Sequence, residues 1–283
     1  MSTIPSIGLG TYCMKGEECA NAVNIAIRFG YRHIDTASVY QNEQDVAEGI
    51  RRSGIPRSEI FITSKLQPRD HGKRAYDACL VTLKNLNTEY LDLYLIHFPG
   101  VAGYQPSDIE QRQIRRESWL SLQRLKADGH CKEIGVSNYT ANHLEDICNA
   151  SVATEWGSYQ LPYVNQFELS PMLQQNDIVQ ACRKFGIQIE SYSTLARGHE
   201  DLLMNETILE IVNEVGSGAT AAQICLSWAL HKGFIVIPKS TRKERIEENF
   251  ASLQIKLTTE QIVRIDLLET TQLRTCWDPT RII

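Results

Sequence analysis

Long apolar runs, linker-like segments and a secretion signal are absent from the sequence. No window approaches the roughly 18 consecutive apolar residues that suggest a membrane-spanning helix. The first residues, MSTIPSIGLGTY, lack the basic segment and the apolar stretch of a signal peptide. No Pro- or Ser-rich linker, charge block or low-complexity tract divides the chain. We therefore expect a soluble, cytoplasmic protein with a single domain over residues 1–283.

Metal-binding patterns and an excess of positive charge are also absent. The eight cysteines form no C-x-x-C pair and no cysteine–histidine cluster at the spacing of zinc ligands. We therefore expect no metal site, and thiols that are mostly buried in a reducing compartment. The formal net charge of −5 offers no general attraction for nucleic acid or for an anionic membrane. An anionic ligand must instead meet a local cluster of positive charge.

The sequence does contain a regular alternation of short apolar runs with helical segments. Several runs are nearly continuous in Ile, Val, Leu and Phe, which is typical of parallel strands covered on both faces. Between them, apolar residues recur at helical spacing, as in Ala22, Ile25, Ala26 and Phe29. Eight such units predict an α/β fold, a single-domain (β/α)8 TIM barrel. The eight runs are residues 7–10, 32–37, 60–66, 91–98, 133–138, 163–169, 187–194 and 234–240.

Two segments bear on this interpretation. The Gly8-Leu9-Gly10 sequence lacks the third glycine and the helix start of a dinucleotide-binding fingerprint, so we set a doubly wound fold aside. The longest irregular segment, residues 99–118, follows the fourth run. A loop there overhangs the C-terminal mouth of a barrel, where active sites of this fold form. We expect this loop and the C-terminal tail, residues 269–283, to lie near that mouth.

Polar residues stand at or near the C-terminal ends of most of these runs. Because those ends meet at one mouth of a barrel, the polar side chains converge there. A single polar residue at a strand end is usually a turn or cap former, but ionisable or amide groups end seven of the eight runs. The seven residues are Asp35, Lys65, His97, Asn138, Gln166, Tyr192 and Lys239.

The motifs around these residues closely resemble those of the aldo-keto reductases. They are GYRHIDTASVYQNE (30–43), ITSKL (62–66), DLYLIHFP (92–99), IGVSN (134–138), VNQ (164–166), YSxL (192–195) and IPKSTxxxRIxEN (237–249). The resemblance extends from about Ile7 to about Leu268. It implies NADPH-dependent reduction of aldehydes and ketones to alcohols. The catalytic residues that it implies are Asp35, Tyr40, Lys65 and His97.

The chemistry of carbonyl reduction explains these four residue types. Hydride transfer creates an alkoxide, which must be protonated as it forms. A tyrosine with a pKa of about 10 is a poor proton donor unless a cation such as Lys65 stabilises its phenolate. Asp35 would orient Lys65, and a neutral His97 would hydrogen-bond the substrate oxygen. Taken singly, the same residues also fit a structural ion pair, a satisfied core histidine and a half-buried tyrosine.

The resemblance also implies contacts with the nicotinamide half of NADPH. Ser137, Asn138 and Gln166 would hydrogen-bond the carboxamide, and Tyr192 would stack on the ring. Alternatively, Ser137 and Asn138 cap the helix that starts near Thr140, and Tyr192 packs in the core. The further cofactor contacts implied by the resemblance are Gly10, Thr11, Asp35, Ser193, Leu195 and Arg197, the last two partly covering the pyrophosphate.

Residues 238–250, PKSTRKERIEENF, carry the strongest cofactor signal. Thr241 and Glu244 form a capping-box pattern, so a helix is expected to begin directly after the eighth strand. A helix N-terminus with basic residues around it suits the 2′-phosphate of NADP(H) better than the free hydroxyl of NAD(H). A solvated, charged helix end is the structural alternative. The expected contacts are Lys239, Ser240, Thr241, Arg245, Glu248 and Asn249, the last two near the adenine.

The substrate contacts follow from the same resemblance and from the tail. They are expected to be Tyr12, Tyr40, Gln67, His97, Phe98 and Trp277. Tryptophan is frequent in mammalian members at the places of Tyr12, Gln67 and Phe98, so Gln67 predicts a less apolar pocket.

These observations predict a monomeric NADPH-dependent oxidoreductase that acts on a small carbonyl substrate, with no nucleic-acid or membrane partner. Within the enzyme class, the alternative is a narrow reductase of a sugar or keto acid. Outside it, the alternatives are a non-catalytic NADPH-binding regulatory subunit on the same fold and a Schiff-base aldolase that uses Lys65 or Lys239.

Overall fold

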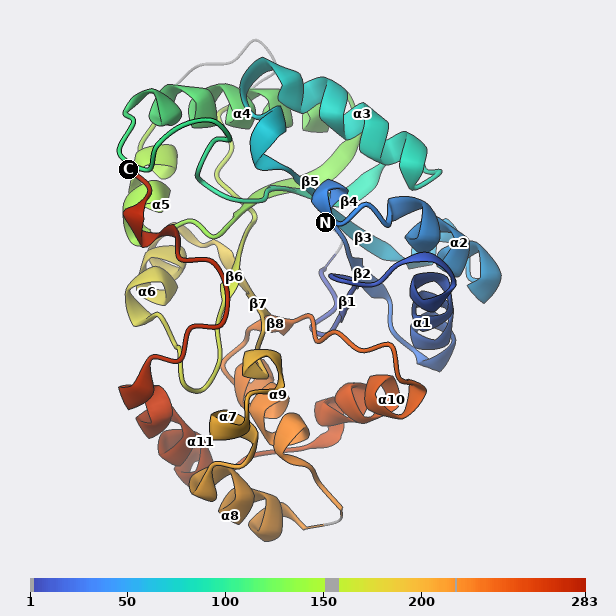
Figure 1. Ribbon diagram of the computed structural model, residues 1–283, viewed down its shortest axis with the longest axis vertical. Helices are drawn as coiled ribbons and strands as arrows, with labels where there is room; N and C mark the ends of the chain where they lie inside the picture. Colours follow the sequence, from blue (N-terminus) through green and yellow to red (C-terminus); the bar gives the residue numbers. More distant parts are fainter. Residues whose placement is uncertain (1–2, 151–157, 217) are drawn as a thin grey trace.

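A ring of eight parallel strands forms the centre of the molecule (Figure 1). The computed structural model describes residues 3–150, 158–216 and 218–283. Strands that follow one another in the chain are neighbours in the sheet, and all seven pairs are parallel. The strands are β1 Leu9–Gly10, β2 His33–Asp35, β3 Phe61–Leu66, β4 Leu91–Ile96, β5 Cys131–Ser137, β6 Val164–Glu168, β7 Gln188–Tyr192 and β8 Ile235–Val236.

The first and last strands meet and close the ring. Ile7 pairs in parallel with Val236, and the Gly8 N–H donates to the Val236 carbonyl at 2.8 Å. A Cβ on Gly10 would lie 2.8 Å from the Ile237 carbonyl oxygen, so a larger residue would push the two strands apart. Gly10 therefore permits the close approach of the chain ends that close the barrel. The predicted (β/α)8 barrel is confirmed.

Helices surround the strand ring on its outer side (Figure 1). Several helices end at a residue in the left-handed conformation, as α2 does at Gly54, whose φ is 72°. In the described part of the chain, no helix is long and apolar enough to cross a membrane. The helices are α1 Gly16–Phe29, α2 Glu43–Ser53, α3 Ala75–Asn85, α4 Glu110–Ala127, α5 Ala141–Cys148, α6 Asn176–Phe185, α7 Glu200–Leu203, α8 Glu206–Val215, α9 Ala221–His231, α10 Lys243–Ala251 and α11 Thr259–Asp266.

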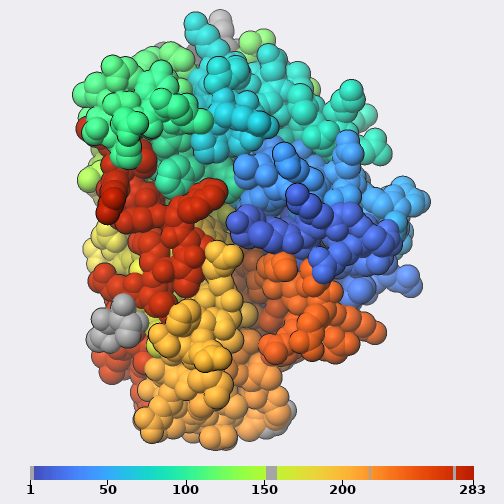
Figure 2. Space-filling view, viewed as in Figure 1, coloured from blue at the N-terminus to red at the C-terminus, as the bar shows by residue number. Residues whose placement is uncertain are grey.

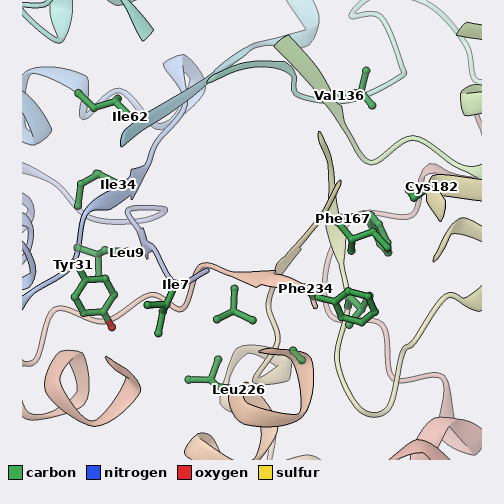
Figure 3. Close-up of a cluster of buried hydrophobic side chains, with 14 of the residues drawn as sticks. Ile7, Leu9, Tyr31, Ile34, Ile62, Val136, Phe167, Cys182, Leu226 and Phe234 are labelled. Atoms are coloured by element: carbon green, nitrogen blue, oxygen red, sulfur yellow. The ribbon is translucent and has the colours of Figure 1, made fainter. Parts of the chain in front are cut away.

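Apolar side chains of the strands form two separate cores. Ile34, Val136 and Phe167 lie outside the ring, in the core that the strands share with the helices (Figure 3). A second cluster, which includes Phe61, Val164 and other strand residues, fills the N-terminal end of the barrel interior. The C-terminal end of the interior therefore remains for polar side chains. Five of the eight cysteines are buried, as expected: Cys19, Cys79, Cys131, Cys182 and Cys225.

The prediction that residues 99–118 form an irregular loop is wrong for the second half of this segment. Helix α4 begins at Glu110, so only the residues before it form a loop. Its first turns escaped prediction because they bury polar side chains in place of apolar ones. Gln111 accepts from the Val101 N–H at 2.8 Å, and Arg115 donates to the Pro99 carbonyl at 3.2 Å. These contacts attach the loop to its own helix.

Candidate active site

A cavity of about 760 Å³ opens where the strands end. Its lining includes Tyr40 and His97, which follow β2 and β4, and Lys239 and Arg245, which follow β8. Figure 2 shows the corresponding hollow between the red C-terminal tail, the gold segment before α8 and the blue N-terminal part of the chain. A cavity of this size is within the range of sites for small molecules and cofactors.

Asp35 and Lys65 form a fully buried ion pair at the floor of the cavity. The Lys65 Nζ lies 2.6 Å from Asp35 Oδ1 and also donates to the Thr36 carbonyl at 2.8 Å. Burial raises the pKa of the Asp35 carboxyl, and hydrogen bonds from Lys65 and Gln166 oppose that rise. Asp35 lines the cavity, whereas Lys65 lies behind it. Lys65 can therefore act on a bound molecule only through its neighbours.

Tyr40 lies at the end of a short 3-10 turn, Ser38–Tyr40, directly above this pair. Its ring centre lies 5.2 Å from the Lys65 Nζ and 5.7 Å from the centre of the His97 ring. Burial, followed by the charge of Asp35, raises the pKa of Tyr40 well above its usual value. The Lys65 hydrogen bonds go to Asp35 and Thr36, so Lys65 acts on Tyr40 only through its charge. Tyr40 is therefore a protonated phenol at neutral pH.

His97 follows β4 and lines the cavity beside Tyr40. Burial, with smaller effects from the Lys65 charge and from His71, lowers the pKa of His97 well below its usual range. The imidazole is therefore neutral and able to donate one N–H. Within the described residues, nothing hydrogen-bonds its Nδ1. A satisfied core histidine, the structural alternative, does not describe this side chain.

Amide side chains occupy the middle of the cavity. Gln166 Nε2 donates to Asp35 Oδ2 at 2.8 Å and to Glu190 Oε1 at 2.7 Å, which uses both of its N–H groups. The Gln166 carbonyl oxygen is thereby left for a ligand. The Tyr192 hydroxyl donates to Asn138 Oδ1 at 2.6 Å, and Asn138 adopts a left-handed conformation with φ of 63°. Gln166, Asn138 and Tyr192 all line the cavity.

Ser137 is buried beneath Asn138 and does not line the cavity. Its Oγ accepts from Asn138 Nδ2 at 3.0 Å, so it holds that side chain in place. The alternative in which Ser137 and Asn138 cap the next helix is wrong. Thr140 caps α5, because its hydroxyl accepts from the His143 N–H.

The basic end of the cavity is formed by the segment between β8 and α10. Lys239, Ser240, Arg245 and Asn249 line it as predicted, and Arg242, which the sequence analysis overlooked, joins them. The predicted capping box is wrong. Helix α10 begins at Lys243 with Arg242 as its N-cap residue, and no side chain caps it. The uncapped N–H groups and the cations on the cavity lining give this segment a positive electrostatic character.

Some expected cofactor residues do not line the cavity. Thr241 is not among the lining residues, and Glu248 instead accepts from the Thr220 hydroxyl at 2.6 Å. The Thr11 hydroxyl is buried and donates to the Asp35 carbonyl at 2.9 Å. The other expected cofactor residues that line it are Gly10, Ser193, Leu195 and Arg197.

Comparison with known proteins assigns the fold and the site to one family. The profile of the Aldo/keto reductase family matches residues 6–270. The chain belongs to this family. Its members are oxidoreductases, and the same four residue types and the basic segment that carried the resemblance lie on the cavity or directly behind it.

Individual relatives cover nearly the whole chain. Glyoxal reductase of Bacillus subtilis is 37% identical over 270 residues, which span 94% of this chain and 89% of that protein. Methylglyoxal reductase DkgA of Salmonella typhimurium is 36% identical, with 95% and 90% covered. The crystal structure of a Bombyx mori aldo-keto reductase in complex with NADP matches with a TM-score of 0.84 and 33% identity, over 97% of this chain and 92% of that one.

In this aldo-keto reductase, the substrate end of the cavity is only partly as expected. Tyr12 and Trp277 line it, and Phe98 packs edge-on against Trp277 with ring centres 6.1 Å apart. Gln67 is buried, does not line the cavity and donates to Asp70 at 2.6 Å. Gln67 therefore does not make the pocket less apolar, as was expected from the sequence, because its side chain is not part of the lining. Lining residues that were not expected from the sequence include Cys13, Thr194, Thr275 and Cys276.

The C-terminal tail reaches the mouth through one buried carboxylate on β6. Glu168 accepts from the Thr275 N–H at 2.7 Å, the Thr275 hydroxyl at 2.6 Å and the Cys276 N–H at 3.1 Å. The tail end is held separately, since Arg115 donates to the Ile283 oxygen at 2.5 Å. Trp277 was expected at the mouth but Glu168 was not, because no motif links a strand residue to a tail more than a hundred positions away.

Proposed function

We propose that the protein reduces aldehydes and ketones to alcohols with NADPH as the hydride donor. The observation that carries this proposal is one cavity with a protonated tyrosine and a neutral histidine at one end and a basic cluster at the other. A carbonyl group and a phosphate-bearing cofactor can therefore occupy the same cavity. One chain supplies both ends, so the proposal needs no second copy, and we expect a monomer.

The middle of the cavity fits a nicotinamide. Because Asp35 and Glu190 take both N–H groups of Gln166, its carbonyl oxygen is oriented to accept from a carboxamide NH2. Asn138 Oδ1 offers a second acceptor, and the half-buried Tyr192 ring supplies an aromatic face. Such contacts would fix the ring with one face toward Tyr40 and His97. When bound there, the cofactor supplies a hydride to the carbonyl carbon.

The basic end fits the 2′-phosphate that only NADP(H) carries. Lys239, Arg242 and Arg245 bring three cations to one end of the cavity. The uncapped start of α10 adds N–H donors, and the peptide dipoles there also favour an anion. Asn249 is buried and lines the same end, where it can contact the adenine.

Tyr40 and His97 carry the proton chemistry. The N–H of the neutral His97 can hold the carbonyl oxygen of the substrate beside the Tyr40 hydroxyl. As negative charge develops on that oxygen, the Tyr40 phenol transfers its proton to it. The Lys65 cation, 5.2 Å from the ring, then stabilises the phenolate that remains, and Asp35 keeps Lys65 in place.

The Schiff-base alternative has no support in this geometry. A lysine nucleophile must be neutral and must reach the substrate carbon. Lys65 is held by Asp35 and does not line the cavity. Lys239 lies in the basic cluster at the other end of the cavity.

A panel assay tests the proposed function. Purified protein with NADPH should consume the cofactor when offered glyoxal, methylglyoxal, aromatic aldehydes, aldoses or α-keto esters, with one class clearly preferred. The alcohol product identified by mass spectrometry is the second readout. Tight NADPH binding without turnover on any member of the panel would favour the regulatory-subunit alternative and overturn the enzymatic one.

A further inference from the structure

A fully buried carboxyl group, Glu190, lies inside the barrel next to the catalytic residues but has no part in the chemistry above. It is on β7, two residues before Tyr192, and its solvent exposure is zero. Glu190 Oε1 accepts from Gln166 Nε2 at 2.7 Å. Glu190 Oε2 has no hydrogen-bond partner within the described residues. A buried oxygen without a partner is rare in proteins and calls for an explanation.

The charges around Glu190 decide its protonation state. The charged groups that act on it are Asp35 from β2 and Lys65 from β3. Its strand neighbours contribute the uncharged Gln166 from β6 and Ile235 from β8. Two buried carboxyl groups therefore share a single cation. Because a second buried negative charge would have no counter-ion, one of the two carboxyls must keep its proton.

The hydrogen bonds show which carboxyl is ionised. Asp35 accepts from Lys65 at 2.6 Å and from Gln166 at 2.8 Å, whereas Glu190 accepts only from Gln166. Asp35, which accepts more hydrogen bonds and contacts the cation, is the anion, and the proton resides on Glu190. Burial and the neighbouring Asp35 charge accordingly raise the pKa of Glu190 to about 8.

We propose that Glu190, in its protonated form, is a positioning residue that fixes the Gln166 amide so that its carbonyl oxygen faces the cofactor. This proposal rests on the proposed function and adds a residue to it. With Glu190 neutral, Gln166 is anchored by two acceptors, one on each side. When Glu190 loses its proton, a second anion beside Asp35 competes for Lys65 and Gln166, and the anchored geometry is lost.

The test compares Glu190→Gln with Glu190→Leu. Glutamine has the shape of a protonated glutamic acid and offers the same acceptor, but it does not ionise. Leucine removes the acceptor. Glu43→Gln is the matched control, because Glu43 is also a buried carboxyl with a raised pKa, but its partners are Ser64 and Asn85.

NADPH affinity is measured by fluorescence titration between about pH 7 and about pH 9.5. In the wild type and in Glu43→Gln, affinity should weaken as the pH rises through about 8. Glu190→Gln should match the wild type at pH 7 and lose this weakening. Glu190→Leu should bind NADPH roughly twofold to tenfold more weakly at pH 7, which corresponds to one lost hydrogen bond. Thermal unfolding checks that each variant is folded.

Infrared spectroscopy supplies a readout that needs no cofactor. The wild type at pH 7 should show a protonated carboxyl band that is lost in Glu190→Gln. If that band is present but NADPH does not bind, the proposed function fails while the protonation of Glu190 stands. If the band is missing, or if folded Glu190→Gln weakens with pH as the wild type does, the positioning role of Glu190 is overturned.

Discussion

Tyr40 keeps its proton because the surrounding protein disfavours a phenolate more than the Lys65 cation favours one. The ammonium group is 5.2 Å from the ring centre, and its own hydrogen bonds go to Asp35 and Thr36. The proton is thus available in the resting enzyme, and Lys65 becomes important as the proton leaves. Tyr40 therefore stabilises the transition state and does not contribute to binding.

Replacing Tyr40 with Phe should therefore separate catalysis from cofactor binding. We expect kcat to fall by about 10²–10⁴-fold, the usual contribution of general acid catalysis. NADPH affinity should stay within about twofold, since the lost hydroxyl is not a proposed cofactor contact. Steady-state kinetics and fluorescence titration measure the two effects. A variant with near-native kcat would remove Tyr40 from the role of proton donor.

Single substitutions in the basic cluster should weaken the binding of NADPH more than the binding of NADH. A charged hydrogen bond contributes roughly 1.5–3 kcal/mol, so Lys239→Met should weaken NADPH binding about tenfold to a hundredfold. NADH, which has no 2′-phosphate, should be affected much less. Lys243→Met is the control, because Lys243 lies on α10 outside the cavity lining and its nearest carboxylate is Glu247 at 3.8 Å. Titrations at several salt concentrations measure the effect.

Equal losses of affinity for NADPH and NADH would contradict that assignment. They would mean that Lys239 contacts the pyrophosphate, which both cofactors share, or that it supports folding. The same titration applied to Arg242→Met tests the cation that only the structure revealed.

At the scale of elements, the C-terminal tail is a separate part attached to the barrel mouth. Glu168 holds Thr275 and Cys276, and Trp277 follows directly with 60% of its surface exposed. The position of Trp277 therefore depends on the hydrogen bonds that Glu168 of β6 accepts from the tail. Aromatic stacking on Phe98 gives the tail a second contact.

Glu168→Gln should loosen the tail without disturbing the cofactor. The variant loses the charge that accepts three hydrogen bonds, so we expect kcat/KM for bulky carbonyls to fall about tenfold. NADPH affinity should stay unchanged. Limited trypsin digestion at Arg274 and Arg281 should become faster than in the wild type. Glu145→Gln, on the exposed face of α5, is the control. Unchanged tail cleavage would show that Glu168 does not hold the tail.

At the scale of the whole molecule, buried histidines make the fold sensitive to acid. Burial lowers the pKa of His33 and His71 to about 3 and that of His143 to about 4, and it lowers that of His97 strongly as well. An unfolded histidine binds a proton below about pH 6.5. These four residues therefore contribute stability above about pH 6.5 that is lost as the pH falls. Glu190 opposes this trend, because its raised pKa makes the folded state bind a proton between about pH 4.5 and about pH 8.

We expect unfolding near pH 5.5 to take up about two to three protons. The free energy of unfolding should then fall by roughly 3 to 4 kcal/mol per pH unit in that region. Urea unfolding at pH 7, 6 and 5 measures this slope. His33→Gln should reduce it by about 1.4 kcal/mol per pH unit if the variant folds. A free energy that does not change over this range would mean that the four histidines are protonated in the folded state.

The sequence alone determined the barrel and most of the site. Eight apolar runs with helical spacing between them could be read locally, because strand and helix periodicities depend only on nearby residues. Asp35, Lys65, His97, Asn138, Gln166 and Tyr192 converge because parallel strands of a barrel end at the same mouth. The family motifs then supplied the roles that we propose for them.

Only the tertiary structure decided where individual side chains go and what they contact. Gln67 turns to Asp70, α10 starts beyond Thr241, and Glu168 binds a tail from the far end of the chain. Glu190 is an unremarkable strand residue in the sequence, and it matters only because the barrel places it beside Asp35. Such outcomes depend on contacts between distant segments and on burial, and no local pattern of residues encodes either one.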